Sequence, residues 1–195
     1  NLSDLENLHE GETVWVLGSG PSLNYIDGAF FDYKLTVSTN FSARALGVKP
    51  DYAFTHYHAN ALDLLSDGSR VVTLANSFKD NSPFPHPAHE NIVLIEQNSY
   101  TPPGSSWNPL TTHPPRKDSL AYGSSSLHGA MHLAAHLGAH FIMLVGADCG
   151  TIDGENRVAG YVPGDTPWAI YNKHHKLMKD YLEQNYPVKI HSLNP

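Results

Sequence analysis

The sequence has little of what builds covalently cross-linked, membrane-spanning or nucleic-acid-binding proteins. Its only cysteine is Cys149, which excludes an internal disulfide and a cysteine-based zinc cluster, so we expect a reducing, cytoplasmic setting. No apolar run approaches the roughly 20 residues of a membrane span, and the opening residues lack the pattern of a signal peptide. Charged residues make up only 16%, and the net charge of −7 argues against a nucleic acid as the partner.

Apolar segments alternate with helical patterns along the 195 residues. This alternation predicts an α/β fold: a three-layer, doubly wound, Rossmann-like and mostly parallel sheet in a single domain over residues 1–195. The expected strands cover residues 13–17, 34–39, 52–55, 70–75, 91–95, 140–145 and 188–191. The main expected helices cover residues 59–65, 124–138 and 167–184. We expect the segments 97–123 and 149–167 to be lid loops over a ligand.

A turn with two glycines follows the first expected strand. Glycine lets the backbone turn sharply and approach a ligand, and the proline that follows suits the first turn of a helix. Free N–H groups at such a start attract anions, phosphate above all. The turn lacks the third glycine of G-x-G-x-x-G and the lysine of a Walker loop, and an ordinary turn without a ligand is the alternative. The expected nucleotide-binding residues here are Gly18, Ser19, Gly20, Pro21 and Ser22.

Polar side chains also follow other expected strands. Ligands of parallel sheets bind beyond the carboxyl ends of the strands, so these residues should gather at one edge. Asn40 and His56 follow the second and third expected strands, and Gly146 and Asp148 follow the long apolar strand near the end. We expect Asp148 to hold a sugar or ribose hydroxyl, to coordinate Mg²⁺, or to cap loop amides.

A run of serines opens the helix expected over residues 124–138. Hydroxyls and free N–H groups at its amino end form a second candidate phosphate cradle, and at least one serine should be an N-cap. We assign the cradle to Ser125 and Ser126. Tyr122, just before them, either stacks on a base or sugar or packs within the lid.

Histidines are frequent, with 13 in the chain. Those at 128, 132 and 136 recur every four residues, opposite the apolar stripe of their helix, so we expect them to face solvent and to bind no metal. His174 falls on the apolar side of the last expected helix, where it is either a hydrogen-bonded core residue or a general base. His175 is the second candidate for that base.

The order of these motifs resembles a known family. Gly18-x-Gly20-Pro21-Ser22-Leu23, Asn40, Ser125-Ser126, Leu137-Gly138, Gly146-x-Asp148 and a closing segment from Tyr181 to Glu183 are similar to the small bacterial sialyltransferases of glycosyltransferase family 42. The opening and the G-x-D strand end are also similar to motility-accessory-factor flagellin glycosyltransferases and to archaeal 6-hydroxymethyl-dihydropterin diphosphokinases.

The resemblance implies residue roles as well as a fold. The resemblance implies that the cytidine monophosphate part of a donor sugar is bound by Gly18, Ser19, Gly20, Asn40, Ser125 and Ser126. Tyr161 and Tyr171 lie in the region that contacts the donor phosphate in the family. The sequence departs from the family at position 19, which is Ser rather than Asn, and His174 is displaced by several residues from the family's catalytic histidine.

From these features we expect a transferase that moves a sugar from a CMP-type donor to a hydroxyl of a small-molecule or glycan acceptor, with no obligatory cofactor or metal. His174 or His175 would deprotonate the acceptor hydroxyl, and helix-terminal amides would stabilise the leaving phosphate. A Mg²⁺-dependent diphosphokinase with Asp148 as metal ligand is the alternative. A nucleotide-binding module without turnover is the third hypothesis, and a homo-oligomer stays open.

Overall fold

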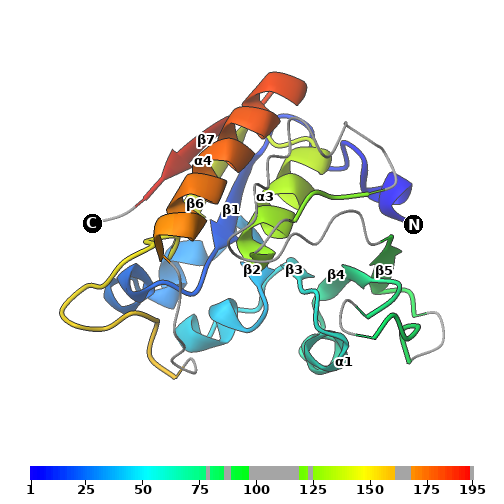
Figure 1. Ribbon diagram of the computed structural model, residues 1–195, viewed down its shortest axis with the longest axis horizontal. Helices are drawn as coiled ribbons and strands as arrows, with labels where there is room; N and C mark the ends of the chain where they lie inside the picture. Colours follow the sequence, from blue (N-terminus) through cyan, green and yellow to red (C-terminus); the bar gives the residue numbers. More distant parts are fainter. Residues whose placement is uncertain (78–79, 86–88, 97–118, 123–124, 161–167, 194–195) are drawn as a thin grey trace.

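A computed structural model describes residues 1–77, 80–85, 89–96, 119–122, 125–160 and 168–193 (Figure 1). Seven parallel strands form one sheet in the order β5-β4-β3-β2-β1-β6-β7. They are β1 (Thr13–Leu17), β2 (Leu35–Thr39), β3 (Tyr52–Phe54), β4 (Arg70–Leu74), β5 (Ile92–Ile95), β6 (Phe141–Val145) and β7 (Lys189–Ser192). Each of the seven expected strands is present, and the predicted α/β fold with a parallel sheet is confirmed.

The chain changes direction across the sheet at its first strand. Strands β1 to β5 are added in one direction, and the chain then returns to place β6 on the free side of β1. Leu17, at the carboxyl end of β1, lies opposite Ser38 of β2 and Val145 of β6. The switch point therefore lies between β1 and β6, where open α/β sheets leave a crevice for ligands.

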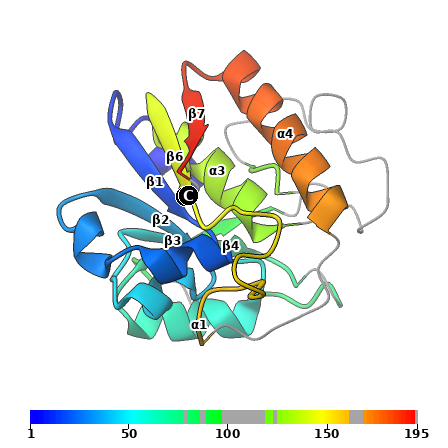
Figure 2. The same ribbon diagram turned by 90° about the vertical axis from the view of Figure 1, so that its left-hand side faces the viewer.

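Helices cover both faces of the sheet (Figure 2). One face carries α3 (Ser126–His136) and α4 (Trp168–Asn185), and the other carries α1 (His58–Ser66) and short 3₁₀ helices. The 3₁₀ helices on that side are η2 (Pro21–Tyr25), η3 (Gly28–Phe31) and η4 (Ser42–Leu46), and η1 (Leu2–Leu5) lies at the start of the chain. Side chains of β1 alternate between the layers, because Val14 and Val16 join the core under α3, whereas Leu17 joins the core on the opposite side.

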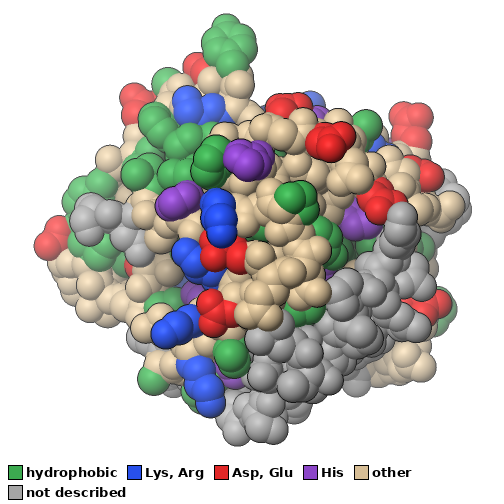
Figure 3. Space-filling view, turned by 90° about the horizontal axis from the view of Figure 1, so that it is seen from above, with side chains coloured by type: hydrophobic (Ala, Val, Ile, Leu, Met, Phe, Trp, Pro, Cys, Tyr) green, Lys and Arg blue, Asp and Glu red, His purple; other side chains and the backbone are tan. Residues whose placement is uncertain are grey.

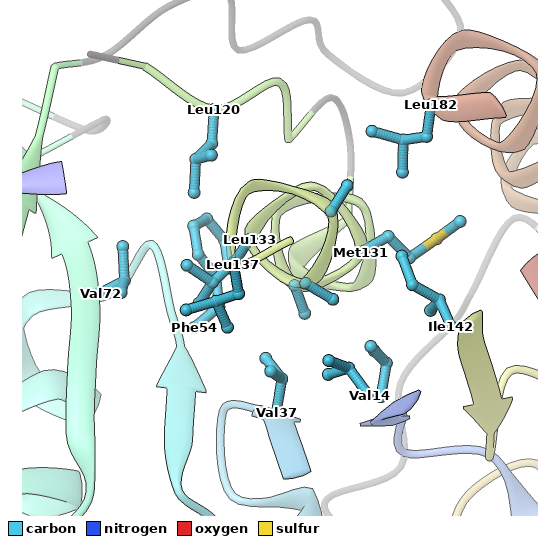
Figure 4. Packing of buried hydrophobic residues seen from close by; sticks show 14 of the residues in the cluster. Val14, Val37, Phe54, Val72, Leu120, Met131, Leu133, Leu137, Ile142 and Leu182 are labelled. Carbon is cyan, nitrogen blue, oxygen red and sulfur yellow. The ribbon is translucent and has the colours of Figure 1, made fainter. Parts of the chain in front are cut away.

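Helix α3 is the buried centre of the larger core (Figure 4). Every residue from Ser126 to His136 is buried. Gly129 lets the ring of Phe54 lie against the helix, because a Cβ at Gly129 would stand 2.2 Å from that ring. Met131 and Leu133 extend from the helix into the apolar layer above the strands. The helix therefore has no solvent face.

This burial contradicts the expectation that the histidines of α3 face solvent. The exposed fractions of His128, His132 and His136 are 0%, 0% and 4%. Residues 119–122, the amino-terminal segment and α4 cover the side that the helical pattern assigned to water. Each of the three histidines is hydrogen-bonded to the backbone of a covering segment. His128 Nδ1 bonds to the Tyr122 carbonyl at 3.2 Å, and His136 Nε2 bonds to the Leu2 carbonyl at 2.9 Å. His132 Nδ1 accepts from the Ala121 N–H at 2.7 Å. These histidines are polar members of the core.

On the face seen from above, acidic and basic side chains are interspersed rather than separated (Figure 3). On α4, the charged atoms of Lys179 and Glu183 are 3.7 Å apart, one turn along the helix. No helix in the described ranges is long and apolar enough to cross a membrane.

Candidate functional site

The glycine loop after β1 closes tightly on the loop after β6. A Cβ at Gly18 would stand 2.3 Å from the carbonyl oxygen of Gly146. One at Gly20 would stand 2.3 Å from Oδ2 of Asp148. Real side chains do not approach atoms so closely, so both positions require glycine. The glycines thus let two loops of this chain meet at the switch point.

The same contact uses the amides that we expected to be free for a phosphate. The Gly20 N–H donates to the Gly146 carbonyl at 2.8 Å, and the Ser22 N–H donates to Asp148 Oδ2 at 2.8 Å. Helix η2, which starts after Gly20, has only one short turn of 3₁₀ geometry. A carboxylate of the chain itself occupies the position expected for a ligand anion, because a negative charge is favoured there. Among the three roles expected for Asp148, capping of a loop amide is observed.

The other side of the glycine loop is covered by the segment 152–160. Arg157 Nη1 donates to Ser19 Oγ at 3.1 Å, and the Val158 N–H donates to the Ser19 carbonyl at 3.0 Å. Val158 is only 3% exposed. This part of the second expected lid is therefore hydrogen-bonded to the glycine loop.

A polar network joins the ends of β2 and β3 to the start of α3. Asn40 Nδ2 donates to Ser126 Oγ at 3.3 Å, and Ser126 Oγ lies 3.0 Å from His56 Nδ1. Asn40 Oδ1 accepts from Thr55 Oγ1 at 2.7 Å and from Asn60 Nδ2 at 3.3 Å. Asn40 has φ of 47°, a left-handed conformation that asparagine tolerates better than most residues. The structure thus brings together Asn40 and His56, which the sequence assigned to one edge, and Ser126, which it assigned to a separate phosphate cradle.

Two hydroxyls tie this network to the end of β1. The carbonyl of Leu17 accepts from Thr39 Oγ1 at 3.1 Å and from Ser42 Oγ at 2.7 Å. Because Leu17 directly precedes the glycine loop, that loop and the serine-led start of α3 share one edge of the sheet. At α3, Ser125 is the N-cap, since its Oγ accepts from the Leu127 N–H at 3.2 Å.

A thiol and an imidazole meet beside Asp148. His175 Nδ1 lies 3.1 Å from Cys149 Sγ. Burial, together with the nearby His174, lowers the pKa of His175 to about 4, and burial together with the Asp148 charge raises the pKa of Cys149 to about 11. The pair is therefore a neutral thiol and a neutral imidazole near pH 7. Cys149 has φ of 48°, and strained backbone of this kind gathers at functional sites.

Several polar atoms at this edge are buried and lack a hydrogen-bond partner in the described part of the chain, and Asp148 Oδ1, His175 Nε2 and Ser22 Oγ are among them. Buried polar groups in folded proteins are nearly always paired, and an unpaired one raises the free energy of the folded state by about 1 to 3 kcal/mol. Such atoms are typical of a site that a ligand completes.

The expected catalytic histidines pack against a third histidine from α3. The ring of His128 lies 4.9 Å from that of His175 and 6.3 Å from that of His174, centre to centre. His174 is 2% exposed, so its inward position is confirmed. Burial lowers the pKa of His128 well below its usual value, and burial also lowers the pKa of His174. Tyr171 stacks over His175 at 6.5 Å.

The remaining candidates divide by location. Tyr122 is fully buried, with its ring stacked at 6.2 Å on that of His56, and it lies beside the network rather than in an open lid. Tyr161 and most of the expected lid 97–123 lie outside the described residues. Cys149 is the residue that sequence reasoning missed. Its signal was present, since it follows Asp148 at the carboxyl end of a buried strand.

Within the described ranges, no three or more His, Cys, Asp or Glu side chains converge in the manner of a metal site. Of the described residues, Asp148 is the one that we named as a metal ligand for the alternative hypothesis. Its Oδ2 is engaged by Ser22.

Fold and edge geometry together define an α/β protein with a doubly wound parallel sheet and a polar site at its switch point. No protein-family model matches the chain, and no curated protein matches it. A solved structure with a similar fold is that of the MAf glycosyltransferase from Magnetospirillum magneticum AMB-1, with a TM-score of 0.54 and 15% sequence identity. The match covers 98% of this chain and 37% of that protein, so the chain spans well under half of its length. The likeness concerns the fold.

Proposed function

We propose that the chain is a nucleotide-sugar-dependent glycosyltransferase, with a CMP-type sugar as donor and a hydroxyl group as acceptor. The observation that carries the proposal is the network of Asn40, His56 and Ser126 at the carboxyl edge, next to the switch point. The fold shared with the MAf glycosyltransferase and the motif resemblance to sialyltransferases support it.

Side chains, rather than the amides of the glycine loop, would hold the donor. Gly20 and Ser22 already donate their N–H groups within the chain, so the nucleotide would contact Asn40, Ser126 and the first turn of α3. The positive end of the α3 dipole and the serine hydroxyls would stabilise the leaving phosphate. Asp148 Oδ1 is buried and has no partner among the described residues, so it would accept a hydrogen bond from a hydroxyl of the ribose or the sugar.

His175 is the better of the two candidate bases. Its Nε2 has no partner in the described part of the chain, and the imidazole is neutral near pH 7. To accept a proton at Nε2, the ring must carry its hydrogen on Nδ1 and donate it to Cys149 Sγ. The thiol would then act as a positioning group that selects the reactive tautomer. His174, which packs on His128, would support the shape of the site.

Calorimetry with CMP, and separately with ATP plus Mg²⁺, tests the donor. We expect CMP to bind to the wild-type protein and to bind at least about tenfold more weakly to Asn40→Asp and Ser126→Ala, each of which removes one donor from the network. Aspartate keeps the left-handed backbone of residue 40 accessible, so folding should persist. Asn185→Asp, at the far end of α4, is the matched control.

Binding of ATP with Mg²⁺ but not of CMP would overturn the proposal and favour the diphosphokinase, for which Asp148 Oδ1 is the available ligand atom. Release of CMP from a CMP-sugar by water measures turnover without a known acceptor. We expect His175→Ala to slow that release at least about 100-fold, as loss of a general base does, without changing CMP affinity. If the wild-type protein binds CMP but does not release CMP from the CMP-sugar, the result would favour a nucleotide-binding module without turnover.

A further inference from the structure

The opposite edge of the sheet holds a cavity of about 450 Å³ at the amino ends of β2, β3 and β4. Cavities of this size accommodate metabolite-sized ligands. Its wall is formed in large part by polar and charged side chains. The residues that matter here are His9, Lys49, Asp51, Tyr52, Gly68 and Arg70. None of them belongs to the site at the carboxyl edge.

Two cations line this cavity without an ion pair in the described ranges: Lys49 and Arg70. Nε of Arg70 is buried and has no hydrogen-bond partner among the described residues. By contrast, Arg44 forms an ion pair, because its Nε lies 2.6 Å from Asp67 Oδ2. Arg70 interacts electrostatically with Asp4 and hydrogen-bonds the Tyr52 hydroxyl, and the carboxylate of Asp51 lines the same cavity. With two cations against one carboxylate, the wall of the cavity favours an anionic ligand.

Gly68 keeps the space beside the lysine open. A Cβ at this position would stand 2.9 Å from Lys49 Nζ, and the backbone has φ of +79°, which favours glycine. The Lys49 ammonium can therefore reach over the glycine to the cavity.

The other polar groups of the wall have partners. Asp51 Oδ2 accepts from the Thr36 N–H at 2.8 Å and from Thr36 Oγ1 at 3.0 Å, so this carboxylate is directed at β2. His9 Nδ1 lies 3.1 Å from Glu12 Oε1, and His9 Nε2 lies 2.9 Å from the Tyr52 hydroxyl. These bonds fix the imidazole and the phenol at the rim. Arg70 also hydrogen-bonds the Tyr52 hydroxyl, so Nε of Arg70 and the Lys49 ammonium are the cationic groups left to meet a ligand.

We propose that this cavity binds a small molecule through an oxyanion group, either a phosphate or a carboxylate. Arg70 presents a guanidinium, a group that can pair with two oxygens at once, and Lys49 adds a point charge in the same cavity. Tyr52, the strand neighbour of Arg70, supplies a hydroxyl at the same wall. The site is independent of the proposed transferase, because the two lie at opposite edges of one sheet and can be filled together.

Calorimetry at constant ionic strength tests the cavity, with inorganic phosphate and citrate as separate probes. We expect saturable binding of at least one probe, weakened about tenfold or more by Lys49→Gln and abolished by Arg70→Gln. Lys49 is exposed, so its variant should fold even where the Arg70 variant does not. The probe that binds identifies the oxyanion as a phosphate or a carboxylate.

Lys189→Gln, an exposed lysine on β7, is the matched control for a general loss of positive charge. Equal weakening by Lys189→Gln, unchanged binding in Lys49→Gln, or no saturable binding of either probe would each overturn the proposal. Asn40→Asp should bind the probe as the wild type does. This control separates a failure here from a failure of the transferase site.

Discussion

One histidine of α3, His132, and one of α4, His175, are bonded differently. In α3, His132 uses both ring nitrogens: Nδ1 accepts from the Ala121 N–H at 2.7 Å, so Nε2 carries the hydrogen that bonds Tyr186 at 2.6 Å. In α4, His175 uses Nδ1 with Cys149, and its buried Nε2 has no partner in the described part of the chain.

The difference separates a structural histidine from a functional one. His132 is fully buried and Nε2 of His175 is buried too, so burial of the ring nitrogens alone does not distinguish them. A fully bonded ring stabilises the fold, because it satisfies buried polar groups of other segments. A ring with one unsatisfied nitrogen destabilises the fold and is retained where a ligand or proton completes it. Stability measurements can test this division directly.

Replacing His132 should have the largest effect. His132→Leu keeps the volume but leaves the Ala121 N–H and the Tyr186 hydroxyl without their partner, so we expect a loss of about 3 kcal/mol in the free energy of unfolding. Urea titration measures it. His140→Leu, the same change at an exposed position just past α3, should stay within about 0.5 kcal/mol. Similar stability for both variants would contradict the structural role of His132.

Acid should destabilise the protein by an intermediate amount. The unfolded chain protonates His175 near pH 6.5, whereas the folded protein does so only near pH 4, so the unfolded state binds more protons between these values. The free energy of unfolding should fall by about 2 to 3 kcal/mol as the pH drops through this window. His128, whose pKa burial also lowers, adds in the same direction.

Unfolding curves at pH 7.5, 5.5 and 4.5 measure this slope, and His175→Leu should make it shallower. A stability that is constant or rises toward pH 4.5 would contradict the neutral, buried state of these rings.

Replacing His175 should have the smallest effect on stability. His175→Leu removes a buried nitrogen without a partner among the described residues and loses one hydrogen bond, to Cys149. Leucine keeps apolar contact with the neighbouring rings of His128 and Tyr171, so the free energy of unfolding at pH 7.5 should change by less than about 1 kcal/mol. Under the proposed function the same variant should lose CMP release. A destabilisation as large as that of His132→Leu would place His175 in the structural class.

The sheet could be predicted from the sequence because strand patterns are local. Runs such as residues 13–17 and 141–145 are apolar on both faces, which a parallel sheet between two helical layers requires. The gathering of Asn40, His56 and Asp148 followed from a rule about strand ends, and it needed no side-chain detail.

The partners of each group could not be predicted, since they depend on contacts between distant segments. The glycine pattern suggested free amides, but Asp148, far along the chain, supplies the acceptor for Ser22. The spacing of the α3 histidines suggested a solvent-exposed face of the helix. The absence of any charged residue between Ser126 and His136 was the signal against it, because a solvent face of that length normally carries Lys or Glu.

The strand order also constrains how the chain assembles. One neighbour of β1, β2, follows it closely along the chain, but the second neighbour, β6, begins only at Phe141. Until then the middle of the future sheet is an open, apolar edge, which is the kind of surface that pairs with other chains. A nascent chain halted before residue 141 should therefore depend on chaperones, whereas one that has completed β6 closes that edge by itself.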